Sequence, residues 1–138
     1  MLIYTIYFDC IYNYINNMIE KDTKKQYENL AKLAVEVASD RLGSDIVLLD
    51  TSEVSSFSDY FVIISAETDR HIDSIANDIT RVIRDQKIHR THKEGSGNGG
   101  WMILEFSGLV VHIFKKNIRQ YYDLEGLWNR AKEILRIQ

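Results

Sequence analysis

Apolar residues recur at steps of three and four in three parts of the chain, the spacing that predicts amphipathic helices. The first part covers residues from about 24 to 42, and Gly43 follows as a natural helix end. The second part runs from Thr68, whose side chain can cap a helix, to about residue 86. The third part begins at Asp123 and carries apolar residues through Leu135. The pattern therefore predicts three helices.

Shorter apolar runs between these segments predict β-strands. The expected strands are residues 46–49, 60–64, 89–93, 101–106 and 109–114. Ser107-Gly108 separates the last two runs, and a two-residue turn with glycine predicts an antiparallel hairpin. The order α-β-β-α-β-β-β-α predicts an α/β fold, with a single mixed β-sheet of about five strands flanked by helices.

Residues 1–17 do not continue this pattern. They are rich in Tyr and Ile but contain Asp9 and three asparagines, so they are too polar and too short for a membrane span. They also lack the basic region and cleavage site of a secretory signal. Met18 resembles an ordinary bacterial start, and we hypothesise that translation mostly begins there. We divide the chain into an N-terminal extension (1–22), disordered or absent from the natural protein, and a folded domain (23–138).

Composition narrows the class of function. The chain has 138 residues, of which 45% are hydrophobic and 27% charged, as expected of one soluble globular domain. The net charge of -3 argues against a protein that grips nucleic acid by charge, but it suits a basic protein partner. Cys10 is the one cysteine of the sequence, which fits a reducing cytoplasm.

The stretch GSGNGGW contains the glycine spacing of a dinucleotide-binding loop, as Gly95, Gly97 and Gly100. That motif must follow a strand and open a helix, so that the helix N-terminus faces the phosphates. Here a polar segment precedes the loop and a strand follows it. The loop is therefore interpreted as a mobile connector that leads to Trp101, and no nucleotide is expected.

Other catalytic and metal-binding patterns are also missing. His89 and His92 are three residues apart, so on a strand their side chains would point to opposite faces. There is no Gly-x-Ser-x-Gly for a hydrolase and no Asp-x-Asp for metal-dependent nucleotidyl transfer. His112 shares a strand face with Val110 and Phe114, which is more typical of a structural histidine than of a base. We predict no catalytic residue, no metal and no cofactor.

Large aromatic residues offer a different chemistry. Trp101 opens the hairpin, and Tyr121, Tyr122 and Trp128 follow it closely in the sequence. Such side chains anchor protein interfaces, but they also fill protein cores. The pattern alone leaves both interpretations open.

Five segments carry more specific motifs. They are Ser55-Ser56-Phe57-Ser58-Asp59-Tyr60-Phe61-Val62-Ile63, Asp69-Arg70-His71, Glu94-Gly95 with Trp101 after the loop, Val110-Val111-His112-Ile113-Phe114, and Arg119-Gln120-Tyr121-Tyr122-Asp123-Leu124-Glu125-Gly126-Leu127-Trp128. In this order, over about residues 25–135, they resemble the Iojap-like ribosomal silencing factors. The hairpin departs from the Asp-x-Gly-Asp that is usual in this family, because it has Glu105-Phe106-Ser107-Gly108. One polar contact of the family is therefore not expected here.

The resemblance implies a nucleotidyltransferase-like core that lacks the metal-binding carboxylates of that enzyme. It implies binding to the large ribosomal subunit through large-subunit ribosomal protein fourteen, which sterically blocks association with the small subunit. Translation would be repressed in starvation or stationary phase, in the cytoplasm of a bacterium. The resemblance further implies that copies of this chain can self-associate as a homodimer, with the oligomeric state left open by the sequence. It also implies little or no direct nucleic-acid recognition and no membrane. The alternatives are a large-subunit assembly factor and a divergent nucleotidyltransferase enzyme.

The resemblance also assigns residues. The expected partner-binding residues are Trp101, Ile103, Glu105, His112, Arg119, Tyr121 and Asp123. Motif residues without an assigned role are Asp59, Tyr60, Arg70, His71, Glu94 and Trp128. The hairpin around Trp101 is the expected docking strand.

Overall fold

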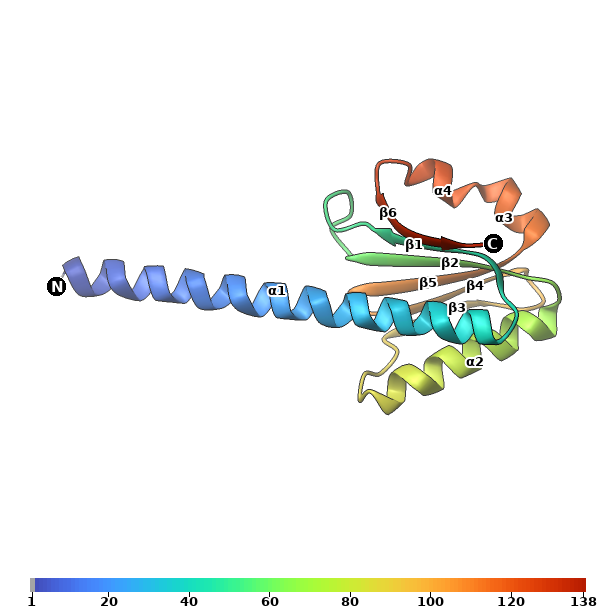
Figure 1. Ribbon diagram of the computed structural model, residues 1–138, viewed down its shortest axis with the longest axis horizontal. Helices are drawn as coiled ribbons and strands as arrows, with labels where there is room; N and C mark the ends of the chain where they lie inside the picture. Colours follow the sequence, from blue (N-terminus) through green and yellow to red (C-terminus); the bar gives the residue numbers. More distant parts are fainter. Residues whose placement is uncertain (1) are drawn as a thin grey trace.

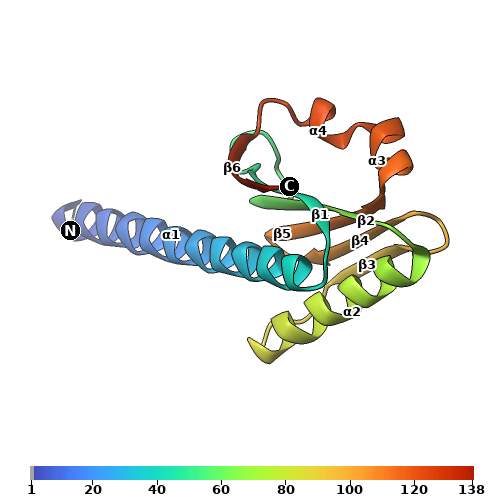
Figure 2. The same ribbon diagram turned by 45° about the vertical axis from the view of Figure 1, so that its right-hand side comes forward.

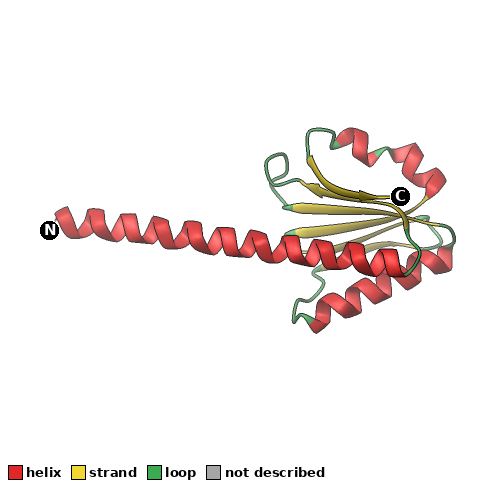
Figure 3. Ribbon diagram, viewed as in Figure 1, coloured by secondary structure: helices red, strands yellow, loops and turns green. Residues whose placement is uncertain are grey.

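The centre of the structure is a six-stranded sheet in the order β3-β4-β5-β2-β1-β6. The structure is a computed structural model that describes residues 2–138. Its elements are α1 (Leu2–Asp40), β1 (Ser44–Asp50), β2 (Tyr60–Ala66), α2 (Asp69–Asp85), β3 (His92–Ser96), β4 (Trp101–Phe106), β5 (Leu109–Lys115), α3 (Lys116–Tyr122), α4 (Leu124–Leu127) and β6 (Lys132–Ile137). Figures 1 and 3 show the long helices α1 and α2 on one side of the sheet and the short helices α3 and α4 on the other.

The sheet is mixed, as the sequence predicts. Among the described strands, β2 and β5 pair in parallel and the other neighbours are antiparallel. α2, β3 and β4 lie between β2 and β5 along the chain, which gives the parallel pair the long connection it needs. β4 and β5 form the expected hairpin, with Ser107 in the left-handed region at φ 59°. The predicted α/β fold class is confirmed.

Several predicted elements are present at or near their expected positions. The second helix begins where its cap was expected, because Thr68 Oγ1 accepts a hydrogen bond from the His71 amide at 3.0 Å. The first two strands are each longer than predicted, and they cover residues 44–50 and 60–66. The polar strand lies at residues 92–96, three positions later than expected.

The predicted final helix begins as expected, with Asp123 capping α4, but it is wrong over residues 132–137. α4 ends at Leu127, and residues 132–137 form β6, a sixth strand that pairs with β1. Ile134 and Leu135 are partly buried against the core from this position. Their spacing fits a helix face, but β1 would otherwise present an unpaired edge. Backbone pairing with β1 therefore decides the structure of this segment.

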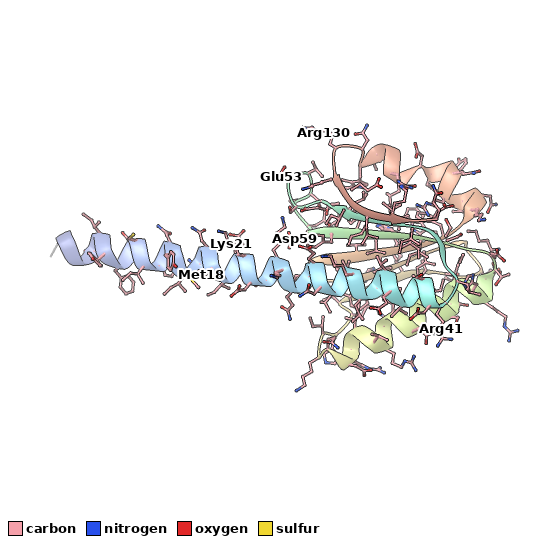
Figure 4. The ribbon with its side chains drawn as sticks, in the orientation of Figure 1. Met18, Lys21, Arg41, Glu53, Asp59 and Arg130 are labelled. Atoms are coloured by element: carbon pink, nitrogen blue, oxygen red, sulfur yellow. The ribbon has the colours of Figure 1, made fainter. Side chains whose placement is uncertain are left out.

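The first helix is longer than predicted. α1 begins at Leu2 rather than near residue 24, and the side chains of residues 5–23 are all exposed. Figures 1 and 2 show this part projecting beyond the sheet, and Figure 4 places Met18 and Lys21 on it. The helix meets the sheet domain at Lys24, whose ammonium group contacts Asp50 at 3.2 Å. Among residues 2–138, no helix has both the length and the hydrophobicity that crossing a lipid bilayer requires.

Alternation along the strands gives the sheet two apolar faces. One face carries Ile46, Leu48, Val62, Ile64, Met102, Leu104, Val111 and Ile113, and it packs against the buried sides of α1 and α2. The other carries Val47, Leu49, Phe61, Ile63, Val110 and Phe114. The short helices α3 and α4 lie on this side of the sheet, as Figure 2 shows, and Trp101, Ile103, Leu124 and Trp128 pack against the second face but are only partly buried. An open surface with apolar side chains remains there.

Candidate protein-binding groove

The second face of the sheet contains a groove of about 350 Å³, which we call the groove throughout. It is lined by Phe57, Phe61, His92, Glu94, Trp101, Ile103, Glu105, Val110, His112, Leu124 and Trp128. Most of these side chains are apolar or aromatic, and the two glutamates lie on β3 and β4. None of the described lining residues is Lys or Arg. The groove thus combines an apolar floor with an acidic edge.

The hairpin builds the floor by strict alternation. On β4, the half-buried Trp101, Ile103 and Glu105 point into the groove, while Met102 and Leu104 are fully buried on the other face. Ile103 of β4 lies directly opposite His112 of β5 in the antiparallel register. The predicted partner-binding residues of the hairpin are therefore brought together on one surface.

Trp101 occupies the centre of an aromatic cluster. Its ring stacks on Phe114, with centroids 4.8 Å apart, and contacts the ring of Tyr122 at 4.9 Å. The indole Nε1–H donates a hydrogen bond to His112 Nδ1 at 3.3 Å. Trp128 packs edge-on against Phe61 at 5.2 Å. Both tryptophans are half-buried, so they pack on the core and also line the groove.

His112 is held as a neutral ring. Because Nδ1 accepts the tryptophan hydrogen bond, the ring proton of the neutral form lies on Nε2. Nε2 is buried and has no hydrogen-bond partner among the described residues. Burial lowers the pKa of His112 to about 4. A buried donor at the floor of the groove suits a structural role beneath Trp101 and no proton transfer at neutral pH.

The acidic edge comes from the edge strand β3 and its neighbour. Glu94 Oε2 lies 3.3 Å from His92 Nε2, and both side chains are exposed. Glu105 lies opposite His92 in the register of β3 and β4. Neither glutamate has a Lys or Arg partner among the described residues. Two carboxylates are thus available to a basic group at the edge of the groove.

Arg119 and Asp123 do not lie in the groove. The Arg119 guanidinium points inward, where it binds Glu125 in a bidentate pair at 2.9 and 3.1 Å. Asp123 has φ 42°, and its carboxylate caps α4 by accepting from the Gly126 amide. Tyr121 is 81% exposed beside Tyr122 and is open to a partner. Of these three predicted residues, the structure leaves Tyr121 best placed for direct contact.

Four motif residues lie outside the groove. Tyr60 is buried on the α1 side, where burial raises the pKa of its hydroxyl, which donates to Glu28 at 3.3 Å. His71 Nδ1 accepts from the Glu67 amide, so its Nε2–H donates to the Arg41 carbonyl and joins α2 to the end of α1. Asp59 forms backbone hydrogen bonds with Gly108 and Thr51, and Arg70 is exposed. Tyr60, His71 and Asp59 support the fold through these contacts, and the role of Arg70 stays unassigned.

The glycine loop is packed rather than free. Gly97 is buried, and its amide donates to Asp73 Oδ1 at 3.1 Å. A side chain at this position would collide with the Asp69 carbonyl in the first turn of α2. The interpretation as a mobile connector is therefore corrected, because close approach to α2 fixes the loop. As expected, the loop leads into β4 and not into a helix.

Sequence reasoning missed part of the groove. Phe57 and Leu124 line it without having been predicted, and Tyr122 supports Trp101 from the side. The alternation along this strand did place Val110 on the same face as His112 and Phe114. No local signal indicates Phe57, because it lies in the turn before β2 and reaches Trp128 only in the folded structure.

The fold and the groove define a small α/β protein with an apolar, acidic-edged binding surface. In the part of the chain that the structure describes, no three His, Cys, Asp or Glu residues are placed to hold a metal ion.

Residues 23–138 match the family described as "Ribosomal silencing factor during starvation". The chain belongs to this family. It is accordingly a non-enzymatic ribosome-binding factor that regulates translation, and its family implies association with the large ribosomal subunit.

Individual relatives agree with this assignment. The chain is 32% identical to ribosomal silencing factor RsfS of Bacillus subtilis over 104 residues, which cover 75% of this chain and 88% of the relative. It is 29% identical to RsfS of Chromobacterium violaceum over 107 residues, 78% of this chain and 88% of the relative. A crystal structure of a Chromobacterium violaceum protein matches with a TM-score of 0.71 at 29% identity, covering 74% of this chain and 85% of that one.

Proposed function

We propose that this chain binds the large ribosomal subunit by docking its groove onto large-subunit ribosomal protein fourteen. A bound copy sterically blocks association with the small subunit and so represses translation in starvation or stationary phase. The functional unit is the domain of residues 23–138, which acts in the bacterial cytoplasm. No chemical step is needed, since occupation of the subunit interface is sufficient.

The observation that carries the proposal is the combination of Trp101 and Trp128 in one open groove. Tryptophan is enriched among residues that dominate binding energy, and such residues sit in apolar surroundings at the centre of an interface. Glu94 and Glu105 at the edge have no Lys or Arg partner among the described residues, which suits a basic surface such as ribosomal proteins commonly present. Tyr121, exposed next to the groove, extends the same surface.

The first experiment is co-sedimentation with purified large subunits through a sucrose gradient, followed by addition of small subunits. Wild-type protein should travel with the large subunit and reduce the formation of joined ribosomes. Trp101→Ala should weaken binding about 30-fold, because loss of an interface anchor costs on the order of 2 kcal/mol. Tyr12→Ala is the matched control, since Tyr12 is a 60% exposed aromatic on the projecting part of α1.

Two outcomes would contradict the proposal. Wild-type protein that stays at the top of the gradient would refute ribosome docking, and equal binding by Trp101→Ala would move the site elsewhere. The partner protein is tested separately with a photo-crosslinking amino acid at Phe57, a 56% exposed residue of the groove. Mass spectrometry should identify ribosomal protein fourteen in the crosslink, and a different protein would overturn that part of the proposal.

A further inference from the structure

One wall of the groove does not belong to the sheet. It is formed by residues 116–128, which comprise α3 and α4 and which we call the corner. Leu124 and Trp128 of the corner line the groove, and Tyr122 packs on Trp101. The shape of the groove therefore depends on where the corner sits.

The corner has little apolar anchorage of its own. Within residues 116–128, all of which the structure describes, Arg119 is the one residue that is buried, at 7% exposure. Ile118, Leu124 and Trp128 pack on the second sheet face but are only partly buried. A charged side chain thus occupies the position at which a helix of this kind usually buries an apolar one.

The Arg119 guanidinium joins four elements. Nε and Nη2 donate to the two carboxylate oxygens of Glu125 at 3.1 and 2.9 Å, which ties α3 to α4. Nη1 donates to the Asp45 carbonyl at 2.6 Å and to Ser65 Oγ at 2.8 Å, which ties both helices to β1 and β2. Arg136 of β6 lies 3.6 Å from the same carboxylate. Four of the five N–H donors of this guanidinium are thus bound to three residues, and Arg119 is not among the residues that line the groove.

The position of the corner is expected to be sensitive to the loss of either Arg119 or Glu125. The Arg119 side chain is buried and the Glu125 side chain is 29% exposed, so removing Glu125 leaves a buried charge uncompensated, which is unfavourable. Lysine cannot replace Arg119 fully, because a planar fork with several donors is needed to bind the carboxylate and the sheet at once. Burial by itself would raise the pKa of Glu125, but the hydrogen bonds and positive charges of Arg119 and Arg136 together outweigh it, and the net direction is downward. The carboxylate therefore stays ionised and paired.

We propose that Arg119 is a positioning residue for partner binding, which acts through Glu125 to hold the corner against the sheet and does not touch the partner. This inference rests on the proposed function for its effect on binding. It reassigns Arg119 from the partner surface, where the family motif places it, to the support of that surface.

The test compares Arg119→Gln, Glu125→Gln, the double variant and Arg119→Lys. Arg130→Gln is the control, because Arg130 is an exposed arginine on the nearby loop between α4 and β6 (Figure 4). Hydrogen exchange of the free proteins should show protection of the corner falling at least about tenfold in Arg119→Gln and Glu125→Gln. Protection of α2 and β5 should be much less affected, and Arg119→Lys should restore part of the loss.

Affinity for purified large subunits then separates positioning from contact. Arg119→Gln and Glu125→Gln should each weaken binding about tenfold or more, and the double variant should be no weaker than the worse single variant. Additive losses, or weaker binding with unchanged corner protection, would overturn the proposal in favour of direct contact. Unchanged corner protection with unchanged binding would also overturn it.

Failure of the proposed function would look different. If wild-type protein does not bind large subunits, ribosome docking fails, but hydrogen exchange of the free proteins still tests whether Arg119 holds the corner. If Arg119→Gln loses hydrogen-exchange protection throughout the chain, this variant is unfolded or globally destabilised. The proposal is then tested with Glu125→Gln and Arg119→Lys. These variants must then show the local loss and its partial restoration, or the proposal falls.

Discussion

The two faces of the sheet start from the same alternating strands but are completed differently. The first face is covered by α1 and α2, which contribute fully buried residues such as Ile75 and Ile79. The second is covered by a seven-residue and a four-residue helix whose one buried residue, within the described range 116–128, is Arg119. Burial of apolar area stabilises the first face, whereas the second retains apolar area for a partner. The comparison separates residues that hold the fold from residues that bind.

The largest expected effect is on the covered face. Ile79→Ala should lower the free energy of unfolding by about 2–5 kcal/mol, because it removes buried methyl groups and leaves a cavity in α2's contact with the sheet. Leu124→Ala, in the half-buried wall of the groove, should lower it by about 1 kcal/mol. Urea unfolding monitored by circular dichroism measures both. Equal losses in the free energy of unfolding would show that the two faces do not differ in their contribution to stability.

The next largest effect is expected on the pH dependence of stability, through His112 at the floor of the groove. Its pKa is about 4 in the folded protein and about 6.5 when unfolded, so the unfolded state binds more protons between these values. This contribution to stability is complete above pH 6.5, and it decreases as the pH falls towards 4, by up to about 3 kcal/mol. Urea unfolding at several pH values should show this slope in the wild type and lose it in His112→Asn. An unchanged slope in the variant would contradict the assignment to His112.

A smaller effect is expected from the charge at the edge of the groove. Glu105→Lys should slow association with large subunits roughly tenfold at low salt and less at high salt, because it reverses a charge that faces a basic partner. Glu36→Lys, an exposed glutamate on α1, makes the same change in net charge away from the groove. Stopped-flow measurements of both variants give the comparison. A similar slowing by Glu36→Lys would show that only net charge matters.

The smallest effect is expected at the projecting end of α1. Removal of residues 1–17 should change the free energy of unfolding by less than about 0.5 kcal/mol, because the exposed residues 5–17 lie beyond the sheet domain. The intact mass of protein made from the native gene should correspond to a start at Met18. A full-length mass would refute that start, and a lower midpoint in the shortened protein would show that the segment supports the domain.

The sequence predicted elements whose determinants are local. The Thr68 cap, the periodicity of α2 and the Ser107-Gly108 turn each depend on a few neighbouring residues, and each appears in the structure. The face shared by Val110, His112 and Phe114 also followed from simple alternation along one strand. These features let the hairpin side of the groove be placed before the fold was known.

Features that depend on distant parts of the chain could not be predicted in this way. β6 exists because β1 lies beside it, although its apolar spacing also fits a helix. The inward direction of Arg119 depends on Asp45, which is 74 positions away in the sequence. The family motif located this arginine in the right region, but only the folded contacts distinguish a residue that supports the surface from one that forms it.

The packing of the glycine loop has a consequence for how such sequences diverge. A side chain at Gly97 would strike α2, whereas a side chain at Gly99 would meet only the Ser96 oxygens at 3.7 Å. Over evolutionary time position 97 should therefore resist substitution while position 99 drifts. A selection for glycine that arises from helix packing would preserve part of a nucleotide-binding signature in a protein for which no nucleotide is expected. Motif searches will keep finding that signature here, and the constraint behind it is steric.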